Sequence, residues 1–273
     1  MAEHPETKTI TRRRFGAIGG GAFASLIFGG AGTGAVACTG AAVGRPFRGA
    51  EAEAAADGRL SARPRANVTT SAKDGRLGLD SGRDAILTLP AKSVEPPLPL
   101  LVLLHGASGN GEGMLRRLGT AVDDAGVAVL SPDSRDGTWD GIRDGFGPDV
   151  AYLDRALERV FETVSIDPAR VAVGGFSDGA TYALSLGLIN GDLFKYIVAF
   201  SPGFIVNGTP RGKAQIFISH GTSDQILPID QCSRVIVPML RQRGYPVTFR
   251  EFSGRHEVPP EIAREGLRFI TGK

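Results

Sequence analysis

Near the middle of the sequence lies Gly174-Gly175-Phe176-Ser177-Asp178-Gly179-Ala180, in which a serine has a glycine two positions away on either side. Arg170-Val171-Ala172-Val173 is typical of a short buried strand, and residues 181–188 have the apolar spacing of a helix. A chain that turns sharply from strand to helix strains the serine backbone and leaves no space for flanking side chains. The pattern predicts a turn that exposes the Ser177 hydroxyl; the alternative is a glycine-rich turn without a chemical role.

From about residue 73, alternating strand and helix signals predict a mostly parallel sheet with helices on both faces. Residues 98–104 form a nearly continuous apolar run, as in a strand that is buried on both sides. The expected strands are 84–89, 98–104, 127–131, 170–173, 196–200, 215–219 and 247–252, and the expected helices are 114–125, 148–164, 181–188, 231–243 and 259–270. This part of the chain leaves little room for a lid, so we expect an open cleft.

The amino-terminal region resembles a bacterial twin-arginine export signal. Residues 11–15, Thr-Arg-Arg-Arg-Phe, precede an uncharged run over residues 16–36 that is rich in glycine and alanine. The low leucine and isoleucine content of this run disfavours a membrane anchor. The predicted division of the chain is an export signal over residues 1–37, a flexible linker over 38–72 and a catalytic domain over 73–273.

The end of the export signal allows two outcomes. Ala35-Val36-Ala37 is an Ala-x-Ala cleavage site, and it directly precedes Cys38, where a lipoprotein would be acylated. Ala35 occupies the position at which lipoprotein signals usually carry leucine. We therefore expect export across the cytoplasmic membrane, and the sequence leaves open a periplasmic or secreted protein and a protein anchored by lipid on Cys38. The other cysteine, Cys232, is expected to be a buried thiol.

The composition limits the classes of partner. A chain of 273 residues with 42% hydrophobic residues can bury a sizeable core in one domain. The formal net charge of +2 gives no basic excess of the kind that nucleic-acid binding requires. The histidines are scattered, and the sequence contains neither His-Glu-x-x-His nor paired cysteines, so we expect no metal and no other cofactor.

The serine-centred turn resembles the nucleophile elbow of the α/β-hydrolases, whose catalytic residues occur along the chain in the order serine, acid, histidine. A serine hydroxyl needs a base, and the base needs an acid that fixes its tautomer. Only His220 and His256 follow Ser177. His220 precedes a glycine at a strand end, where a ring usually hydrogen-bonds the loop backbone. We therefore expect His256, in a turn after the last strand, to be the base.

The acid is expected after the strand that precedes the strand of the base. Asp224 has this position, whereas the alternative, Asp230, would cap the next helix. The oxyanion of the tetrahedral intermediate needs two N–H donors. We expect one from Asp178, where the start of the helix adds a favourable dipole, and one from Ala107, in the glycine-rich loop after the long apolar strand.

Aromatic side chains are the candidates for substrate contact. Trp139, the only tryptophan of the chain, and Phe146 follow the strand at 127–131, where this fold opens toward the cleft. They are predicted to form a wall for an acyl or aryl group, and the alternative is loop packing. Phe204 is a further candidate.

Four ordered motifs resemble the phospholipase/carboxylesterase family, which includes acyl-protein thioesterase-like enzymes and small bacterial esterases. They span residues 104–106, 175–179, 220–228 and 254–256. The resemblance implies an α/β-hydrolase fold and a serine carboxylesterase that hydrolyses small-molecule or lipid-like esters through an acyl-enzyme. It also implies a catalytic triad of Ser177, Asp224 and His256.

Two departures from the family pattern affect the expected acyl specificity. Asp178 stands where thioesterase-like members usually carry glutamine, and Ser108 and Asn110 replace the usual glycine and aspartate of the oxyanion loop. Secreted depolymerase-like and feruloyl esterases share much of the pattern, including the lead-in at residues 167–170. An extracellular depolymerase or a feruloyl esterase is therefore an alternative, as is a non-catalytic binding protein with the same fold.

Overall fold

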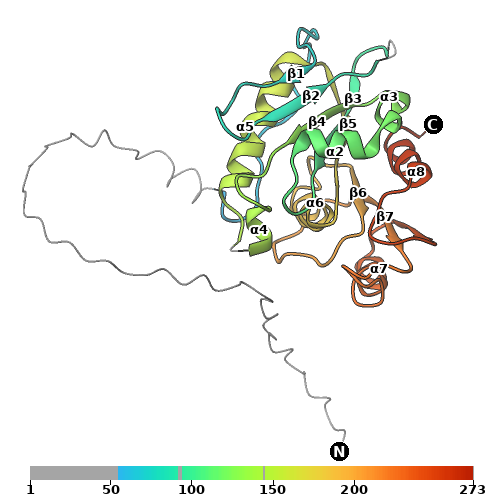
Figure 1. Cartoon of the computed structure of the whole chain (residues 1–273). Helices are drawn as coiled ribbons and strands as arrows, with labels where there is room; N and C mark the ends of the chain where they lie inside the picture. Colours follow the sequence, from blue (N-terminus) through green and yellow to red (C-terminus); the bar gives the residue numbers. More distant parts are fainter. Residues whose placement is uncertain (1–54, 92–93, 144, 273) are drawn as a thin grey trace, which may run out of the picture. The chain divides into compact units, whose positions relative to one another are not determined.

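A mostly parallel sheet of eight strands forms the centre of the computed structural model, which describes residues 55–91, 94–143 and 145–272 (Figure 1). The strand order is β1-β2-β4-β3-β5-β6-β7-β8; β2 pairs antiparallel with both β1 and β4, and the other neighbours pair in parallel. The strands are β1 (Gly75–Arg76), β2 (Ala85–Thr88), β3 (Leu98–Leu104), β4 (Ala128–Pro132), β5 (Ile166–Phe176), β6 (Tyr196–Phe200), β7 (Gln215–Gly221) and β8 (Val247–Phe252). The mostly parallel sheet predicted from the sequence is confirmed.

Helices connect the strands along most of the described chain. They are α2 (Gly111–Leu118), α3 (Thr120–Ala125), α4 (Asp140–Arg143), α5 (Pro148–Thr163), α6 (Asp178–Ile189), α7 (Ser233–Gln242) and α8 (Pro260–Thr271). Within the described ranges, none of them is both long enough and apolar enough to cross a membrane. The predicted export signal and Cys38 lie outside the described residues.

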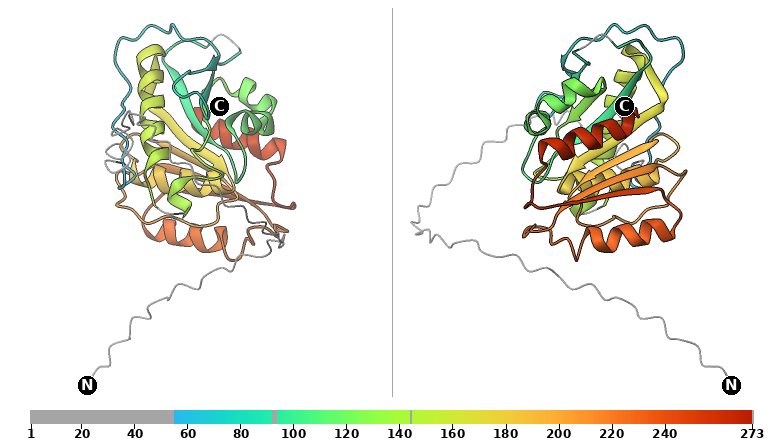
Figure 2. Two further views of the ribbon diagram at one scale, coloured as in Figure 1. Left: turned by 60° about the vertical axis from the view of Figure 1, so that its left-hand side comes forward. Right: turned by 90° about the vertical axis from the view of Figure 1, so that its right-hand side faces the viewer.

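Successive side chains of β3 point to opposite faces of the sheet, as the two-residue period of a strand requires. Leu100, Val102 and Leu104 pack in one hydrophobic core with α5, α6 and α7, whereas Leu101 and Leu103 pack in a second core with α2, α3 and α8. Figure 2 shows α5 and α8 on opposite sides of the sheet. Because both faces of β3 are buried, its sequence is apolar at almost every position.

The helix predicted over residues 114–125 is divided into α2 and α3. Gly119 lies between them with a φ of 54°, a conformation that glycine adopts without strain. The side chain of Asn110 caps the start of α2 by accepting a hydrogen bond of 2.7 Å from the N–H of Gly113.

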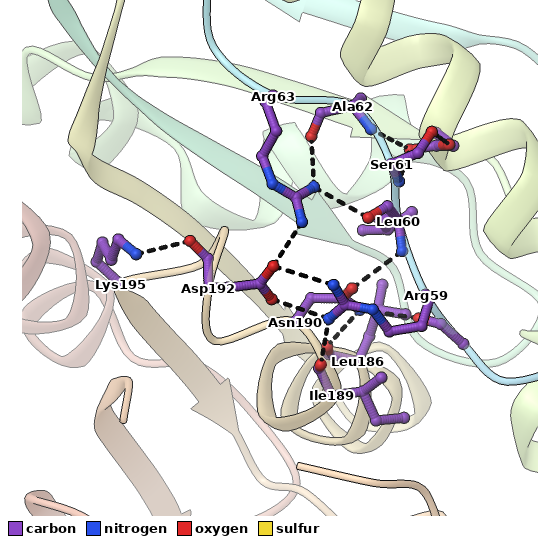
Figure 3. Close-up of polar contacts among 12 residues, drawn as sticks. Arg59, Leu60, Ser61, Ala62, Arg63, Leu186, Ile189, Asn190, Asp192 and Lys195 are labelled. Atoms are coloured by element: carbon purple, nitrogen blue, oxygen red, sulfur yellow. Dashed lines mark hydrogen bonds and ion pairs between the residues drawn. The ribbon is translucent and has the colours of Figure 1, made fainter. Parts of the chain in front are cut away.

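The structure differs from the predicted linker over residues 38–72, because the described part of that segment packs against the domain (Figure 3). The Leu60 side chain is only 2% exposed. Its backbone N–H donates to Oδ1 of Asn190 at 2.9 Å, and the amide of Asn190 donates back to the carbonyl of Gly58 at 2.8 Å. Asp154 on α5 accepts from the N–H groups of Ser61 and Ala62, both at 2.8 Å.

Ion pairs add to this attachment. Arg59 and Arg63 contact the two carboxylate oxygens of Asp192, just after α6, at 2.8 and 2.6 Å. The hydrogen bond from Arg59 is the main cause that lowers the pKa of Asp192 below its ordinary value. Residues 55–63 attach to the domain through one buried leucine and a set of polar contacts. Such a segment has no regular spacing of apolar residues, so hydrophobic periodicity does not predict that it is folded.

Candidate active site

A strained serine lies at the turn between β5 and α6. Ser177 has a φ of 58°, which a residue with a side chain rarely adopts, and its N–H donates to the carbonyl of Phe200 at 3.0 Å. A Cβ on Gly175 would lie 2.5 Å from the carbonyl of Gly179, and a Cβ on Gly179 would lie 2.2 Å from that of Leu104. Side chains at either position would therefore collide with backbone that has little freedom to move.

The structure brings Ser177, Asp224 and His256 together at the carboxyl ends of three parallel strands. Nε2 of His256 lies 2.8 Å from Oγ of Ser177, and Nδ1 lies 2.6 Å from Oδ2 of Asp224. An ionised carboxylate only accepts hydrogen bonds, so Nδ1 carries the proton and Nε2 is left to accept from the serine hydroxyl. Ser177 follows β5, Asp224 follows β7 and His256 follows β8.

The Asp224 carboxylate is surrounded by N–H donors. Its Oδ1 accepts from the backbone N–H groups of Ile226 and Leu227, both at 2.9 Å. Burial alone would raise the pKa of Asp224, but the hydrogen bonds from Leu227 and His256 outweigh it and hold the pKa below its ordinary value. Asp224 is therefore ionised at neutral pH.

A second imidazole, that of His220, also contacts Asp224. Its Nε2 lies 2.7 Å from the carbonyl of Leu227 and 3.2 Å from Oδ2 of Asp224, and its Nδ1 lies 2.7 Å from Oγ of Ser233. Burial lowers the pKa of His220, and the contacts with Leu227 and Asp224 offset this only in part. The sequence indicates that this ring bonds loop backbone, but not that it reaches the carboxylate, although His220 lies only four residues before Asp224.

The two expected oxyanion donors belong to segments next to Ser177. Ala107 lines the same cleft as Ser177 and His256, and Asp178 is the first residue of α6. The loop that contains Ala107 approaches the serine closely, since a Cβ on Gly106 would lie 3.3 Å from Cβ of Ser177.

His105 fixes the loop that carries Ala107. Its Nε2 accepts from the N–H of Ser134 at 3.0 Å, and its Nδ1 lies 2.7 Å from the carbonyl of Gly106. The carboxylate of Asp178 accepts a hydrogen bond of 2.6 Å from the hydroxyl of Thr138, which ties the start of α6 to the loop after β4.

The predicted aromatic wall is corrected by the structure. Trp139 has no exposed surface; its Nε1–H donates to the carbonyl of His105 at 2.8 Å, and its ring stacks on Tyr182 with 5.2 Å between centroids. Phe146 is 9% exposed and packs against the same tyrosine. Trp139 therefore holds the end of β3 from within the core, and Phe146 packs with Tyr182 as part of that core. Phe204 is half exposed but does not line the cleft.

The cleft beside Ser177 has a volume of about 490 Å³. Met114, Phe176 and Ile226 give it an apolar part, and Arg116 and Arg117 on α2 give it a cationic part. A second cavity, of about 560 Å³, lies between residues 55–63 and α5. Its lining does not include Ser177, Asp224 or His256. In the part of the chain that the structure describes, no group of three or more histidine, cysteine or acidic residues is arranged to hold a metal ion.

Comparison with solved structures defines the fold. The esterase PE8 superimposes with a TM-score of 0.56 at 22% sequence identity, over 68% of this chain and 96% of that chain. Together with the sheet order and the turn at Ser177, this shows that the chain has the α/β-hydrolase fold.

Sequence comparison gives matches to esterases. The model of the phospholipase/carboxylesterase family matches residues 144–271. The esterase-named protein NocK of Nocardia uniformis subsp. tsuyamanensis is 28% identical over 186 residues, which cover 63% of this chain and 53% of NocK. Feruloyl esterase C of Emericella nidulans is 27% identical over 161 residues, which cover 55% of this chain and 58% of the relative. The chain spans little more than half the length of these relatives. These matches support the family assignment that the motifs indicate.

Proposed function

We propose that this protein is a serine carboxylesterase that hydrolyses carboxylic esters through an acyl-enzyme intermediate. The observation that carries the proposal is the unbroken series of hydrogen bonds from Asp224 through His256 to Ser177. In such a series the neutral imidazole accepts the hydroxyl proton as the oxygen attacks, and the carboxylate stabilises the imidazolium that forms. The match of residues 144–271 to the phospholipase/carboxylesterase family supports the same class of reaction.

The proposed reaction has two stages. Oγ of Ser177 attacks the ester carbonyl carbon while His256 takes the hydroxyl proton, and the backbone N–H groups of Ala107 and Asp178 bind the oxyanion. His256 then gives the proton to the departing alcohol, which leaves the acyl group on Ser177. In the second stage His256 takes a proton from water as the water attacks the acyl carbon, and the free acid leaves with the serine restored.

The proposed substrates are small-molecule or lipid-like esters. The cleft volume of about 490 Å³ is in the range of small-molecule sites. Because one relative is named a feruloyl esterase, an aryl ester such as methyl ferulate is the second candidate. A panel of esters from acetyl to long-chain acyl, with methyl ferulate and a polyester film, separates the carboxylesterase from the feruloyl esterase and the depolymerase.

The central test replaces Ser177 by alanine in the full chain. Ser177→Ala is expected to reduce the turnover of p-nitrophenyl butyrate to the background rate. The matched control is Ser223→Ala, because Ser223 is an exposed serine in the loop before Asp224 and contributes only backbone to the fold. Hydrolysis that persists in Ser177→Ala would point to another nucleophile. A wild-type protein that hydrolyses no ester of the panel would favour the non-catalytic binding protein.

We further propose that the enzyme acts after export. Support comes from the sequence of residues 11–37, since this segment lies outside the described residues. Replacing Arg12 and Arg13 by lysine is expected to retain the protein in the cytoplasm, and unchanged export in a cell fractionation would refute this. Cys38→Ser then separates lipid attachment from free secretion, because only an anchored protein would move from the membrane to the soluble fraction.

A further inference from the structure

The charged side chains that line the cleft beside Ser177 are all cationic. Among the described residues, the lining includes Arg116 and Arg117 from α2 and no aspartate or glutamate. Both arginine side chains are exposed. A ligand that enters this cleft therefore meets positive charge close to the reacting serine.

Arg116 and Arg117 differ in how that charge is used. Arg116 forms an ion pair of 2.5 Å with Glu112, one turn earlier on the same helix. Arg117 has no ion-pair partner within the described ranges, and its Cζ atom lies 4.5 Å from the centroid of the Phe176 ring. The positive charge of Arg117 is thus not neutralised by the protein.

The stacking contact places Arg117 next to the catalytic groups. Phe176 directly precedes Ser177 in the chain, and its ring centroid lies 4.7 Å from that of His256. A guanidinium that lies over an aromatic ring keeps the N–H donors at its edge available, and these donors match the two oxygens of a carboxylate. Met114 and the 69% exposed Ile226 lie in the same cleft and give it apolar surface for a methylene chain.

We propose that Arg117 is a specificity-determining residue that binds the free carboxylate of ester substrates whose acyl chain ends in a negative charge. This subsite rests on the proposed esterase function and names a substrate class for it, the monoesters of dicarboxylic acids. The scissile ester lies at Ser177, the methylene chain follows the apolar surface, and the distal carboxylate pairs with the guanidinium of Arg117.

The test compares two chromogenic esters in the full chain at low ionic strength. Mono-p-nitrophenyl adipate carries a carboxylate at the end of its acyl chain, and p-nitrophenyl heptanoate carries a methyl group there. The ratio of their kcat/KM values is the readout, because this ratio does not depend on the amount of folded enzyme. Arg117→Gln is expected to lower the adipate-to-heptanoate ratio about fivefold, mainly through a higher KM for the adipate ester. Arg117→Lys is expected to retain part of the preference, and added salt to weaken it in the wild type.

Arg159→Gln is the matched control, since it removes one positive charge from an exposed position on α5 outside the cleft. Its ratio is expected to equal that of the wild type. An unchanged ratio in Arg117→Gln, or an equal decrease in Arg159→Gln, would overturn the subsite while hydrolysis of the heptanoate ester still supports the esterase. Failure of the wild type to hydrolyse either ester would instead overturn the esterase and the subsite with it.

Discussion

Asp224→Asn tests the role of the acid by changing one atom of its side chain. Four N–H groups face the carboxylate: those of Ile226 and Leu227 at Oδ1, and those of His256 and His220 at Oδ2. An asparagine has one oxygen and one NH₂ group, so it cannot accept from both sides. Turning the NH₂ toward the backbone would leave two buried N–H groups without acceptors, at about 1–3 kcal/mol each.

The variant is therefore expected to keep its oxygen on Ile226 and Leu227 and to turn its NH₂ toward His256. Nδ1 of His256 must then accept, which moves the ring proton to Nε2, opposite Ser177. In this tautomer the ring cannot take the serine proton. The expected loss in kcat is about a thousandfold to ten-thousandfold, or about 4 to 5.5 kcal/mol of transition-state stabilisation.

The assay is the hydrolysis of p-nitrophenyl butyrate at neutral pH, with circular dichroism to confirm folding. Asp230→Asn is the control, because Asp230 lies close by in the chain and forms only an exposed ion pair with Arg234. Removing such a pair costs less than about 1 kcal/mol and leaves the active site unchanged. A folded Asp224→Asn variant that loses less than about tenfold in kcat would refute the assigned role of Asp224.

Three further predictions concern the turn, the amino-terminal segment and pH. Gly179→Ala is expected to destabilise the protein by about 3 kcal/mol or more, or to prevent folding, because its Cβ would overlap the Leu104 carbonyl; wild-type stability in urea would contradict this. Leu60→Ala is expected to cost about 2–4 kcal/mol of unfolding free energy, and a change below about 0.5 kcal/mol would show that residues 55–63 are not part of the cooperative fold. Asp192→Asn is expected to cost about 1 kcal/mol or less at neutral pH, because both ion pairs are partly exposed. Since the pKa of Asp192 is lower in the folded protein, its contribution is present above the ordinary carboxyl pKa and is lost as the pH falls below it, so the two melting temperatures should converge in acid. A difference that grows in acid would contradict the assigned direction.

The sequence predicted most accurately those elements whose signal is local. The strands Leu98–Leu104, Tyr196–Phe200 and Val247–Phe252 have the predicted bounds. Burial on both faces of the sheet produces continuous apolar runs. The turn around Ser177 is marked by Gly175 and Gly179, because a side chain at either position would collide with the backbone.

Features that depend on distant partners were not predictable in the same way. The burial of Trp139 depends on the carbonyl of His105, an acceptor 34 residues earlier. The contact of Arg117 with Phe176 joins a helix to the end of β5, and the second imidazole on Asp224 depends on the course of the loop at residues 222–228. Apolar periodicity contains no information about such polar and aromatic contacts, and the segment at residues 55–63 was missed for the same reason.

The most direct test of the proposed mechanism is the labelling of the protein by a fluorophosphonate, which reacts with serine only where a base activates it. After tryptic digestion, the phosphonyl group is expected on the peptide of residues 171–195, which contains both Ser177 and Ser185. Fragmentation of this peptide should place the group on Ser177, and labelling of a folded His256→Gln variant should be about a thousandfold slower. Labelling at Ser185 or elsewhere, or labelling of Ser177 at an equal rate without His256, would contradict the activation of Ser177 by His256 and Asp224.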